Sequence, residues 1–468
     1  MKYSRFVPAM IMAALISLSN INLKAKIIPA SNPLIEYTGR IDFSNPDAPK
    51  FSYSGVSIRA NFAGTEISMI LDEEKGENYF NIIVDKVQMS RVKVEKGKHQ
   101  YTLAKNLENK VHEVEIFRST EEMFGKSTFL GFEVNKDVSL VEISNKRDRL
   151  IEFIGNSITC GYGNEAELGA SFSAATENHY FTYAAVTSRS FNARHLAVCK
   201  SGIGIYRNYD GPATGNPDCM PNYYKRIFLY DEKPNYSFKE KPDLICIDLG
   251  TNDFSTNGGD SARYVNGYIN FIDSLQHYYN KPEILCIIGP MLNGATLVRL
   301  RKYVNFISVF TNNRGKGKVS FFEMSEQKGD LGMGGDSHPT VAQHLKNAQE
   351  LTNFISVLKG WGIIPIPLKA EVATPNMLTL SFNVEIKDTT KIFSGFKITV
   401  DGKPGNITST YKDHSNGSKL NLVLEEFIKP GQTVELNYQK GRLSGKGGIL
   451  LEPFEKLNVI NQLTPPLR

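Results

Sequence analysis

The feature that most constrains the fold is a regular alternation of apolar runs with helical stretches across the middle of the chain. The apolar runs have the length of single strands and cover 150–154, 193–198, 244–249, 284–288 and 319–324. The amphipathic stretches between and after them cover 180–191, 262–279, 295–310 and 340–358. Strands without a polar face must be covered on both sides, so this pattern predicts a parallel sheet between two layers of helices. We expect one α/β domain over 148–362.

The regions on either side have a different pattern. Between residues 35 and 144, short runs alternate apolar and polar residues and are separated by turn residues, as at 56–62, 80–84 and 112–117. Such period-two runs predict antiparallel strands, and therefore a β-sandwich of the jelly-roll kind over 26–147. After the Pro-rich segment 363–367 the alternation returns, with a hairpin signal at Asp401-Gly402. We expect an Ig-like β-sandwich over 363–468.

The first residues have the features of a secretory signal. Lys2 and Arg5 precede an apolar run over 6–18, which is short for a membrane span, and Ala25 offers a small residue for cleavage. The alternative is a buried or membrane-anchoring helix. We expect a signal peptide over 1–25, a secreted or periplasmic location, and no membrane attachment after its removal.

Charge and cysteine content exclude several functions. The formal net charge is +5, and removal of Lys2, Arg5 and Lys24 lowers it to +2, which is too small to indicate a nucleic-acid partner. The five cysteines include no CxxC pair and have no spacing typical of a metal site. We expect no metal and no cofactor.

Polar residues follow the predicted strands at the edge where an open α/β sheet places its active crevice. They are Ser157 after the first strand, Gly202 after the second, Asn252 after the third and His338 after the fifth. A serine hydroxyl needs a base to act as a nucleophile, and a neutral imidazole can serve. Three hydrogen-bond donors could stabilise an oxyanion: the backbone N–H groups of Ser157 and Gly202, and the side-chain amide of Asn252. This set predicts acyl transfer.

The same residues resemble a known family. Gly155-Asn156-Ser157-Ile158, Gly202, Gly250-Thr251-Asn252-Asp253 and His338 resemble the four blocks of SGNH (GDSL-type) hydrolases. More narrowly, 153–165, Thr176-Glu177-Asn178, 201–209 and Met220-Pro221 resemble carbohydrate esterase family 2. The resemblance covers about 35–359. It implies a jelly roll ahead of a flavodoxin-like catalytic domain, and a metal-free acetylesterase that transfers acetyl groups from xylan or related polysaccharides to water through Ser157 and His338.

Two departures from the common SGNH pattern affect the predicted roles. Asn156 replaces an aspartate that supports the turn, so we expect little effect on the nucleophile. Asp336 lies two residues before His338 rather than three. In the narrower family some members rely on a Ser–His pair with a backbone carbonyl orienting the ring. Asp336 is therefore one candidate for orienting His338, and a backbone carbonyl is the other.

A Tyr-rich segment between the second and third strands is the predicted substrate contact. Tyr206, Tyr209 and Tyr223 offer flat apolar faces that suit sugar rings, although ordinary loop packing explains them as well. We also expect Asp253 to brace its turn and His112 to face outward. Two other functions stay open: an SGNH esterase or lipase with a different acyl specificity, and a non-catalytic carbohydrate-binding protein.

Overall fold

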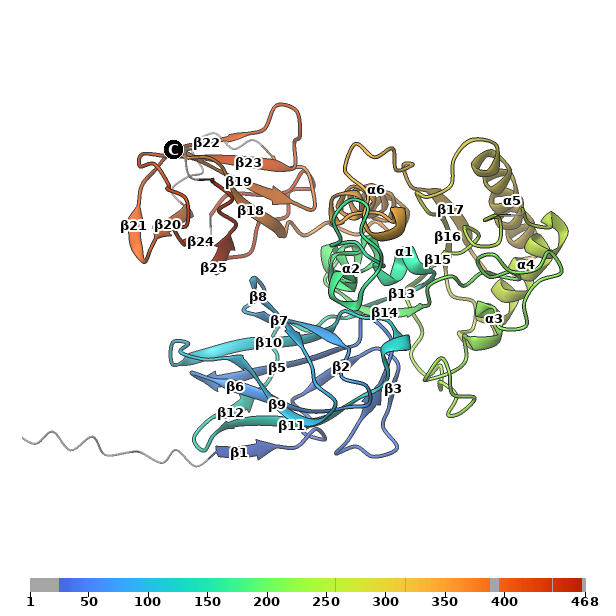
Figure 1. The fold of residues 1–468 in the computed structure, drawn as a ribbon, viewed down its shortest axis with the longest axis horizontal. Coiled ribbons are helices and arrows are strands. Elements are labelled where there is room, and N and C mark those ends of the chain that lie inside the picture. Colours follow the sequence, from blue (N-terminus) through green and yellow to red (C-terminus); the bar gives the residue numbers. More distant parts are fainter. Residues whose placement is uncertain (1–24, 257, 316, 388–394, 440, 465–468) are drawn as a thin grey trace, which may run out of the picture.

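The computed structural model describes residues 25–464 except 257, 316, 388–394 and 440. The chain forms an N-terminal β-sandwich, a central α/β unit and a C-terminal β-sandwich (Figure 1). The predicted signal peptide lies outside the described residues except for Ala25, which begins the first strand. The architecture changes between Val141 and Arg149 and again between Lys359 and Pro367.

The N-terminal unit consists of two six-stranded antiparallel sheets, as the alternating pattern predicted. One sheet contains β3 (Ile41–Asp42), β4 (Lys50–Phe51), β11 (Ser127–Asn135), β6 (Ile67–Glu73) and β9 (Gly97–Ala104), with β1 (Ala25–Ile28) beside β11. The other contains β12 (Ser139–Val141), β5 (Ser57–Gly64), β10 (Lys110–Arg118), β7 (Tyr79–Val84) and β8 (Gln88–Lys93), with β2 (Glu36–Thr38) beside β5. The prediction for His112 was wrong. Its side chain is buried, and its Nδ1 lies 2.7 Å from Asp85 Oδ2, because this carboxylate satisfies the ring inside the fold.

The central unit is a five-stranded parallel sheet in the flavodoxin-like order. In spatial order its strands are β14 (Ala193–Cys199), β13 (Arg149–Gly155), β15 (Leu244–Asp248), β16 (Ile284–Ile288) and β17 (Val319–Glu323). Gly155 is paired in register with Cys199 on one side and with Asp248 on the other. The segments after these three strands therefore leave the sheet at the same edge.

Helices cover both faces of this sheet, as predicted (Figure 1). On one face, α2 (Tyr183–Ser190) and α6 (Val341–Lys359) pack against Phe153. On the other, α4 (Ser261–Tyr278) and α5 (Gly294–Asn313) pack against Ile247. The cluster on the second face is continuous with the core of the N-terminal sandwich, so the two units share one apolar interior.

The C-terminal unit has its own core between two four-stranded antiparallel sheets. They are β18 (Pro367–Thr374), β19 (Met377–Phe382), β23 (Lys419–Leu424) and β22 (Ile407–Lys412), and β21 (Lys403–Gly405), β20 (Phe396–Val400), β24 (Val434–Tyr438) and β25 (Phe454–Val459). Asp401 and Gly402 both have positive φ between β20 and β21, as the predicted hairpin requires.

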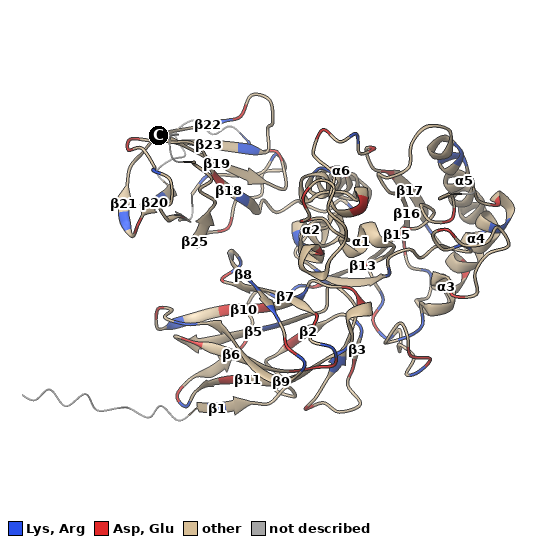
Figure 2. Cartoon of the chain, in the orientation of Figure 1, with Lys and Arg blue, Asp and Glu red and all other residues tan. Residues whose placement is uncertain are grey.

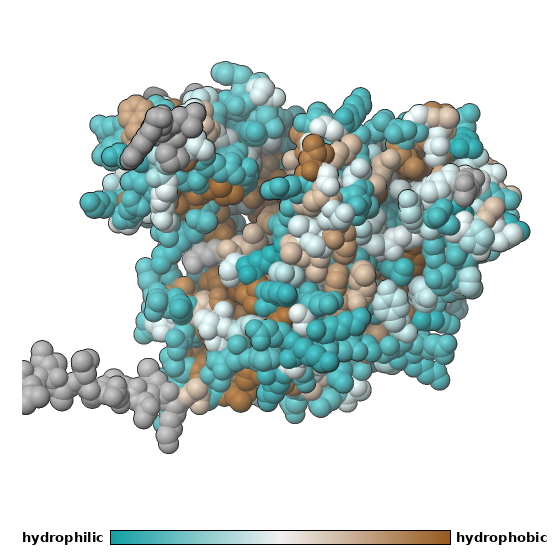
Figure 3. Space-filling view, viewed as in Figure 1, coloured by the Kyte–Doolittle hydropathy of each residue, from teal (hydrophilic) through white to brown (hydrophobic). Residues whose placement is uncertain are grey.

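The C-terminal sandwich contacts both other units. Val87, in the hairpin between β7 and β8, packs against its core, and Lys110 forms an ion pair with Glu455 at 2.7 Å. Asn383 Nδ2 donates to Ser190 Oγ, at the end of α2. Apolar residues line the space between this sandwich and the rest of the molecule (Figure 3). These contacts hold the third unit beside the other two.

A buried arginine joins the N-terminal and central units. The guanidinium of Arg40 is fully buried, pairs with Glu152 Oε1 at 3.2 Å and donates to the carbonyl oxygens of Tyr224 and Arg226. It also lies over the rings of Tyr224 and Tyr236. Since a buried charge must be paired and hydrogen-bonded, this network fixes how the two units meet.

Basic and acidic residues are interspersed along the ribbon of all three units in the view of Figure 2. Within the described residues, no helix is long and apolar enough to cross a membrane.

Candidate active site

Ser157 is the first residue of a short helix that follows β13, the first strand of the central unit. The strand β13 ends at Gly155, and α1 (Ser157–Cys160) starts two residues later. Asn156 caps this helix, because its Oδ1 accepts from the N–H of Ile158 at 2.9 Å while its Nδ2 donates to the carbonyl of Asp248. Asn156 therefore supports the turn that precedes Ser157, as predicted.

His338 meets Ser157 across this edge. Its Nε2 lies 2.9 Å from Ser157 Oγ, although 181 residues separate the two in sequence. The loops that carry them are tied together at two glycines, since the N–H of Gly335 donates to the carbonyl of Gly163 at 2.9 Å. A Cβ at Gly163 would approach the Gly335 backbone closely, so the contact needs glycine there.

The other ring nitrogen of His338 faces a backbone carbonyl. Nδ1 lies 3.1 Å from the oxygen of Gly335, which can only accept a hydrogen bond. Nδ1 must therefore carry the proton, and Nε2 of the neutral ring is left to accept the proton of the Ser157 hydroxyl. Burial lowers the pKa of His338 below its usual range, opposed by hydrogen bonds to the backbone of Gly335 and Asp336. The ring is thus neutral near pH 7 and oriented as a base.

Asp336 does not orient the ring through its carboxylate, which corrects one of the two alternatives. Its Oδ2 accepts from the hydroxyl of Tyr162 at 2.8 Å and from the N–H of Phe172 at 3.1 Å. The reason is the backbone: Asp336 and Ser337 both have positive φ, and this turn directs the exposed carboxylate toward the neighbouring loop. The oxygen that faces the imidazole belongs to Gly335.

A hydrogen bond joins the two loops that carry the other predicted oxyanion donors, Gly202 and Asn252. Asn252 is buried, and its Nδ2 donates one hydrogen bond to the carbonyl of Ile203 at 2.8 Å. Ile203 directly follows Gly202, whose φ of +77° turns the chain there. The amide of Asn252 has a second N–H. The loops after β14 and β15 are therefore joined at the point where both donors were predicted.

Asp253 braces this edge, as predicted. Its buried carboxylate accepts hydrogen bonds from the N–H groups of Ile205, Tyr206 and Arg207, at 2.9 to 3.1 Å. Burial raises the pKa of Asp253 to about 6, against the effect of these donors. The carboxylate thus fixes the start of the long loop that follows Gly202.

The three tyrosines predicted to bind substrate lie in different surroundings. Tyr209 is 62% exposed, and its N–H donates to the carbonyl of Gly202. Tyr206 is half-buried, accepts from the N–H of Asp260, and lines a cavity of about 480 Å³ together with Arg263. The guanidinium carbon of Arg226 lies 4.4 Å from the ring centroid of Tyr223. Of the three tyrosines, Tyr209 is the one that is exposed and bonded to the loop of Gly202.

Two aromatic residues beside His338 were missed by the sequence analysis. The ring of Tyr162 lies 4.3 Å from the imidazole of His338 and stacks on Phe172 at 4.0 Å, measured between ring centroids. Tyr162 lies in the block 153–165 that carries the family resemblance, which was the available signal. Phe172 had none, because it lies in an irregular segment between α1 and α2.

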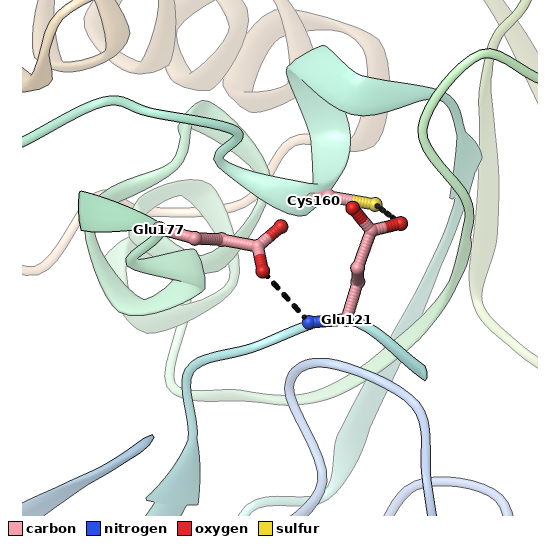
Figure 4. Close-up of side chains that lie close together, drawn as sticks. All are labelled: Glu121, Cys160 and Glu177. Carbon is pink, nitrogen blue, oxygen red and sulfur yellow. Dashed lines mark hydrogen bonds between the residues drawn. The ribbon is translucent and has the colours of Figure 1, made fainter. Parts of the chain in front are cut away.

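One group of potential metal ligands occurs among the described residues. Glu121, Cys160 and Glu177 are buried, and their ligand atoms lie within 4.8 Å of one another (Figure 4). Both oxygens of Glu121 accept hydrogen bonds from Ser201. The cluster includes Cys160, the last residue of α1, whose first residue is Ser157.

A flavodoxin-like sheet with a hydrogen-bonded serine and histidine at its carboxyl edge defines a serine hydrolase of the SGNH class. Comparison with family models agrees, since residues 151–351 match "GDSL-like Lipase/Acylhydrolase". Residues 37–143 match "Carbohydrate esterase 2 N-terminal".

Comparison with individual proteins points to a narrower family within this class. The chain is 38% identical over 331 residues to the cellulase/esterase CelE of Acetivibrio thermocellus, a match that covers 70% of this chain and 40% of that relative. It is 26% identical to an acetylxylan esterase/glucomannan deacetylase of Cellvibrio japonicus, over 71% of this chain and 91% of the relative.

Solved structures give the same result. A family two carbohydrate esterase from Clostridium thermocellum, in complex with cellohexaose, superposes with a TM-score of 0.66 at 37% identity, covering 70% of this chain and 99% of that one. A family two carbohydrate esterase from Cellvibrio japonicus superposes with a TM-score of 0.66 at 25% identity, covering 72% of this chain and 99% of that one. The chain belongs to carbohydrate esterase family 2, and is a serine ester hydrolase.

Proposed function

We propose that the protein is a secreted or periplasmic acetylesterase that removes O-acetyl groups from xylan or a related polysaccharide. The observation that carries this proposal is the 2.9 Å contact between Ser157 Oγ and His338 Nε2, with Nδ1 of the same ring held by the Gly335 carbonyl. Relatives named for acetylxylan and glucomannan support the substrate class. The basic and apolar segment at the start of the chain supports export.

The proposed reaction has two steps. Nε2 of His338 takes the proton of Ser157 as its oxygen attacks the acetyl carbon, and the ring then gives this proton to the departing sugar oxygen. Water next attacks the acetyl-serine with the same ring as base, releasing acetate and restoring the hydroxyl. In both steps the N–H groups of Ser157 and Gly202 and the amide of Asn252 would donate to the oxyanion.

The acyl specificity can be tested by comparing esters of one alcohol. We expect kcat/KM for an acetyl ester to exceed that for the octanoyl ester at least tenfold, because the segment around Tyr206 and Tyr209 is rich in tyrosine and asparagine, which suits a polar substrate better than a long apolar acyl chain. An equal or higher value for the octanoyl ester would favour a lipase. Acetate release from acetylated xylan, glucomannan and pectin would then identify the preferred polysaccharide.

A second candidate is binding of a β-glucan chain without its hydrolysis. One similar esterase was solved in complex with cellohexaose, and this chain has the stacked rings of Tyr162 and Phe172 beside His338 and the exposed ring of Tyr209 beside Gly202. Such faces suit sugar rings. Calorimetric titration of the Ser157→Ala variant with cellohexaose would detect this binding, and Tyr209→Ala should weaken it.

A further inference from the structure

A glutamate from the N-terminal sandwich reaches into the catalytic unit. Glu121 lies in the segment between β10 and the 3-10 helix η1 (Glu122–Phe124), and it is buried. Its Oε2 accepts from the N–H of Ser201 at 2.9 Å, and its Oε1 accepts from the Ser201 hydroxyl at 2.7 Å. One carboxylate thus satisfies both hydrogen-bond donors of Ser201.

The position of Ser201 makes this contact important. Ser201 directly precedes Gly202, the predicted oxyanion donor on the loop after β14. The thiol of Cys160 also donates to Glu121 Oε2, at 3.8 Å (Figure 4). Because Cys160 ends the helix that Ser157 begins, Glu121 contacts both the element that carries the nucleophile and the loop that carries the donor.

Glu121 is itself held by a second buried glutamate. Its backbone N–H donates to Glu177 Oε2 at 3.0 Å, and the carboxyl group of Glu177 points toward Glu121 and Cys160 (Figure 4). Burial, followed by the charge of Glu121, raises the pKa of Glu177 well above its usual range. Among the described residues, neither glutamate forms an ion pair with a lysine or arginine. The N–H and hydroxyl groups of Ser201 are therefore the main polar partners of the Glu121 carboxylate.

We propose that Glu121 is a positioning residue that holds the Gly202 loop in place for catalysis, so that the N-terminal sandwich completes the oxyanion site of the central unit. This inference rests on the proposed hydrolase function. Donors to an oxyanion act only when they are preorganised at the correct place, and a displacement of about 1 Å can cost roughly a hundredfold in rate. A loop tied at Ser201 by two hydrogen bonds has this preorganisation.

The test compares Glu121→Gln with Glu122→Gln. Glutamine keeps the size of the side chain but removes its charge and one of its two acceptor oxygens, so that its amide N–H would donate to the Ser201 hydroxyl instead of a carboxylate oxygen accepting from it. Glu122 is the matched control, because it is the next residue, is equally buried and has no described hydrogen bond to Ser201. For an acetyl ester we expect Glu121→Gln to lower kcat about 10- to 100-fold while KM changes less than threefold. Glu122→Gln should keep kcat within threefold, with both variants melting within a few degrees of the wild type.

A double-mutant cycle tests whether Glu121 acts through Ser201. We expect Ser201→Ala to lower kcat about 5- to 10-fold, and the double variant with Glu121→Gln to be no slower than Glu121→Gln alone. The proposal would be overturned if the double variant lost kcat by the product of the two factors measured for the single variants. A kcat of Glu121→Gln equal to that of Glu122→Gln would also overturn it. The same holds if activity is lost on dialysis against EDTA and restored by Zn²⁺, because the cluster of Glu121, Cys160 and Glu177 would then be a metal site.

These outcomes are distinct from a failure of the hydrolase function itself. If wild type hydrolyses the ester, Ser157→Ala does not, and Glu121→Gln equals its control, then the hydrolase function holds and only the positioning role is wrong. If Ser157→Ala keeps full activity, the function proposed above fails first.

Discussion

The imidazole of His338 is oriented by the backbone carbonyl of Gly335, 3.1 Å from its Nδ1. A carbonyl stabilises the developing imidazolium less than a charged carboxylate, but it cannot change protonation and it sits on the same turn as the histidine. The Ser157–His338 pair therefore has the geometry of a dyad supported by the backbone, and the carboxylate of Asp336 accepts hydrogen bonds from Tyr162 and Phe172 instead.

Asp336→Asn should consequently be a mild change. The asparagine oxygen can still accept from Tyr162 and Phe172, so the loop is preserved and we expect kcat to fall by less than about tenfold. In a serine protease triad, replacing the aspartate by asparagine costs about 10⁴. Steady-state kinetics on an acetyl ester checks this, and a loss of a thousandfold or more would restore Asp336 as the orienting group.

The pH profile follows from the environment of His338. Only the neutral ring can accept the serine proton, and burial lowers the pKa of this histidine below its usual value of about 6.5. As pH falls, activity should therefore persist until the pH reaches this lowered value. We expect the acidic limb of kcat/KM to have its midpoint below 6.5; a midpoint above 6.5 would show that the ring is stabilised in its charged form.

The aromatic stack beside the histidine should support its position. Tyr162 contacts the ring of His338 on one side and Phe172 on the other, and its hydroxyl donates to Asp336. Tyr162→Phe keeps the stack, and we expect less than a fivefold fall in kcat. Tyr162→Ala removes it and should lower kcat about 10- to 100-fold. Equal rates for the two variants would mean that the ring contributes nothing beyond its hydroxyl.

The contact between the N-terminal and central units should depend on Arg40. Arg40→Met leaves the carboxylate of Glu152 buried without its cation, and breaking such a pair costs about 3–5 kcal/mol. Thermal unfolding should show a clear fall in Tm, and the double variant with Glu152→Gln should recover part of it. An unchanged Tm in the single variant would show that the pair does not stabilise the interface.

Much of the site could be predicted because parallel strands end at one edge. Once the five apolar runs were recognised, Ser157, Gly202, Asn252 and His338 had to emerge there, and their loops do. Asp253 was also recognisable as a brace, since a short carboxylate in a turn commonly accepts local N–H groups.

The rest depends on details that sequence spacing does not contain. Which oxygen faces His338 is decided by positive φ at Asp336 and Ser337, and neither residue type demands it. Glu121 reaches Ser201 across 80 residues and between two units, so no local pattern reveals it. The alternation of its strand predicted that His112 faces outward. Its side chain is buried instead, because the carboxylate of Asp85 forms a hydrogen bond with its ring in the interior.

The most direct test of the account is the initial rate of acetate release from acetylated xylan by wild type and by Ser157→Ala at equal concentration. His338 Nε2 lies 2.9 Å from the hydroxyl of Ser157, which is the proposed nucleophile. Because the variant lacks this hydroxyl, its rate should be lower by at least about a thousandfold. Wild-type release by Ser157→Ala would contradict the account, because the reaction would then proceed without the proposed nucleophile.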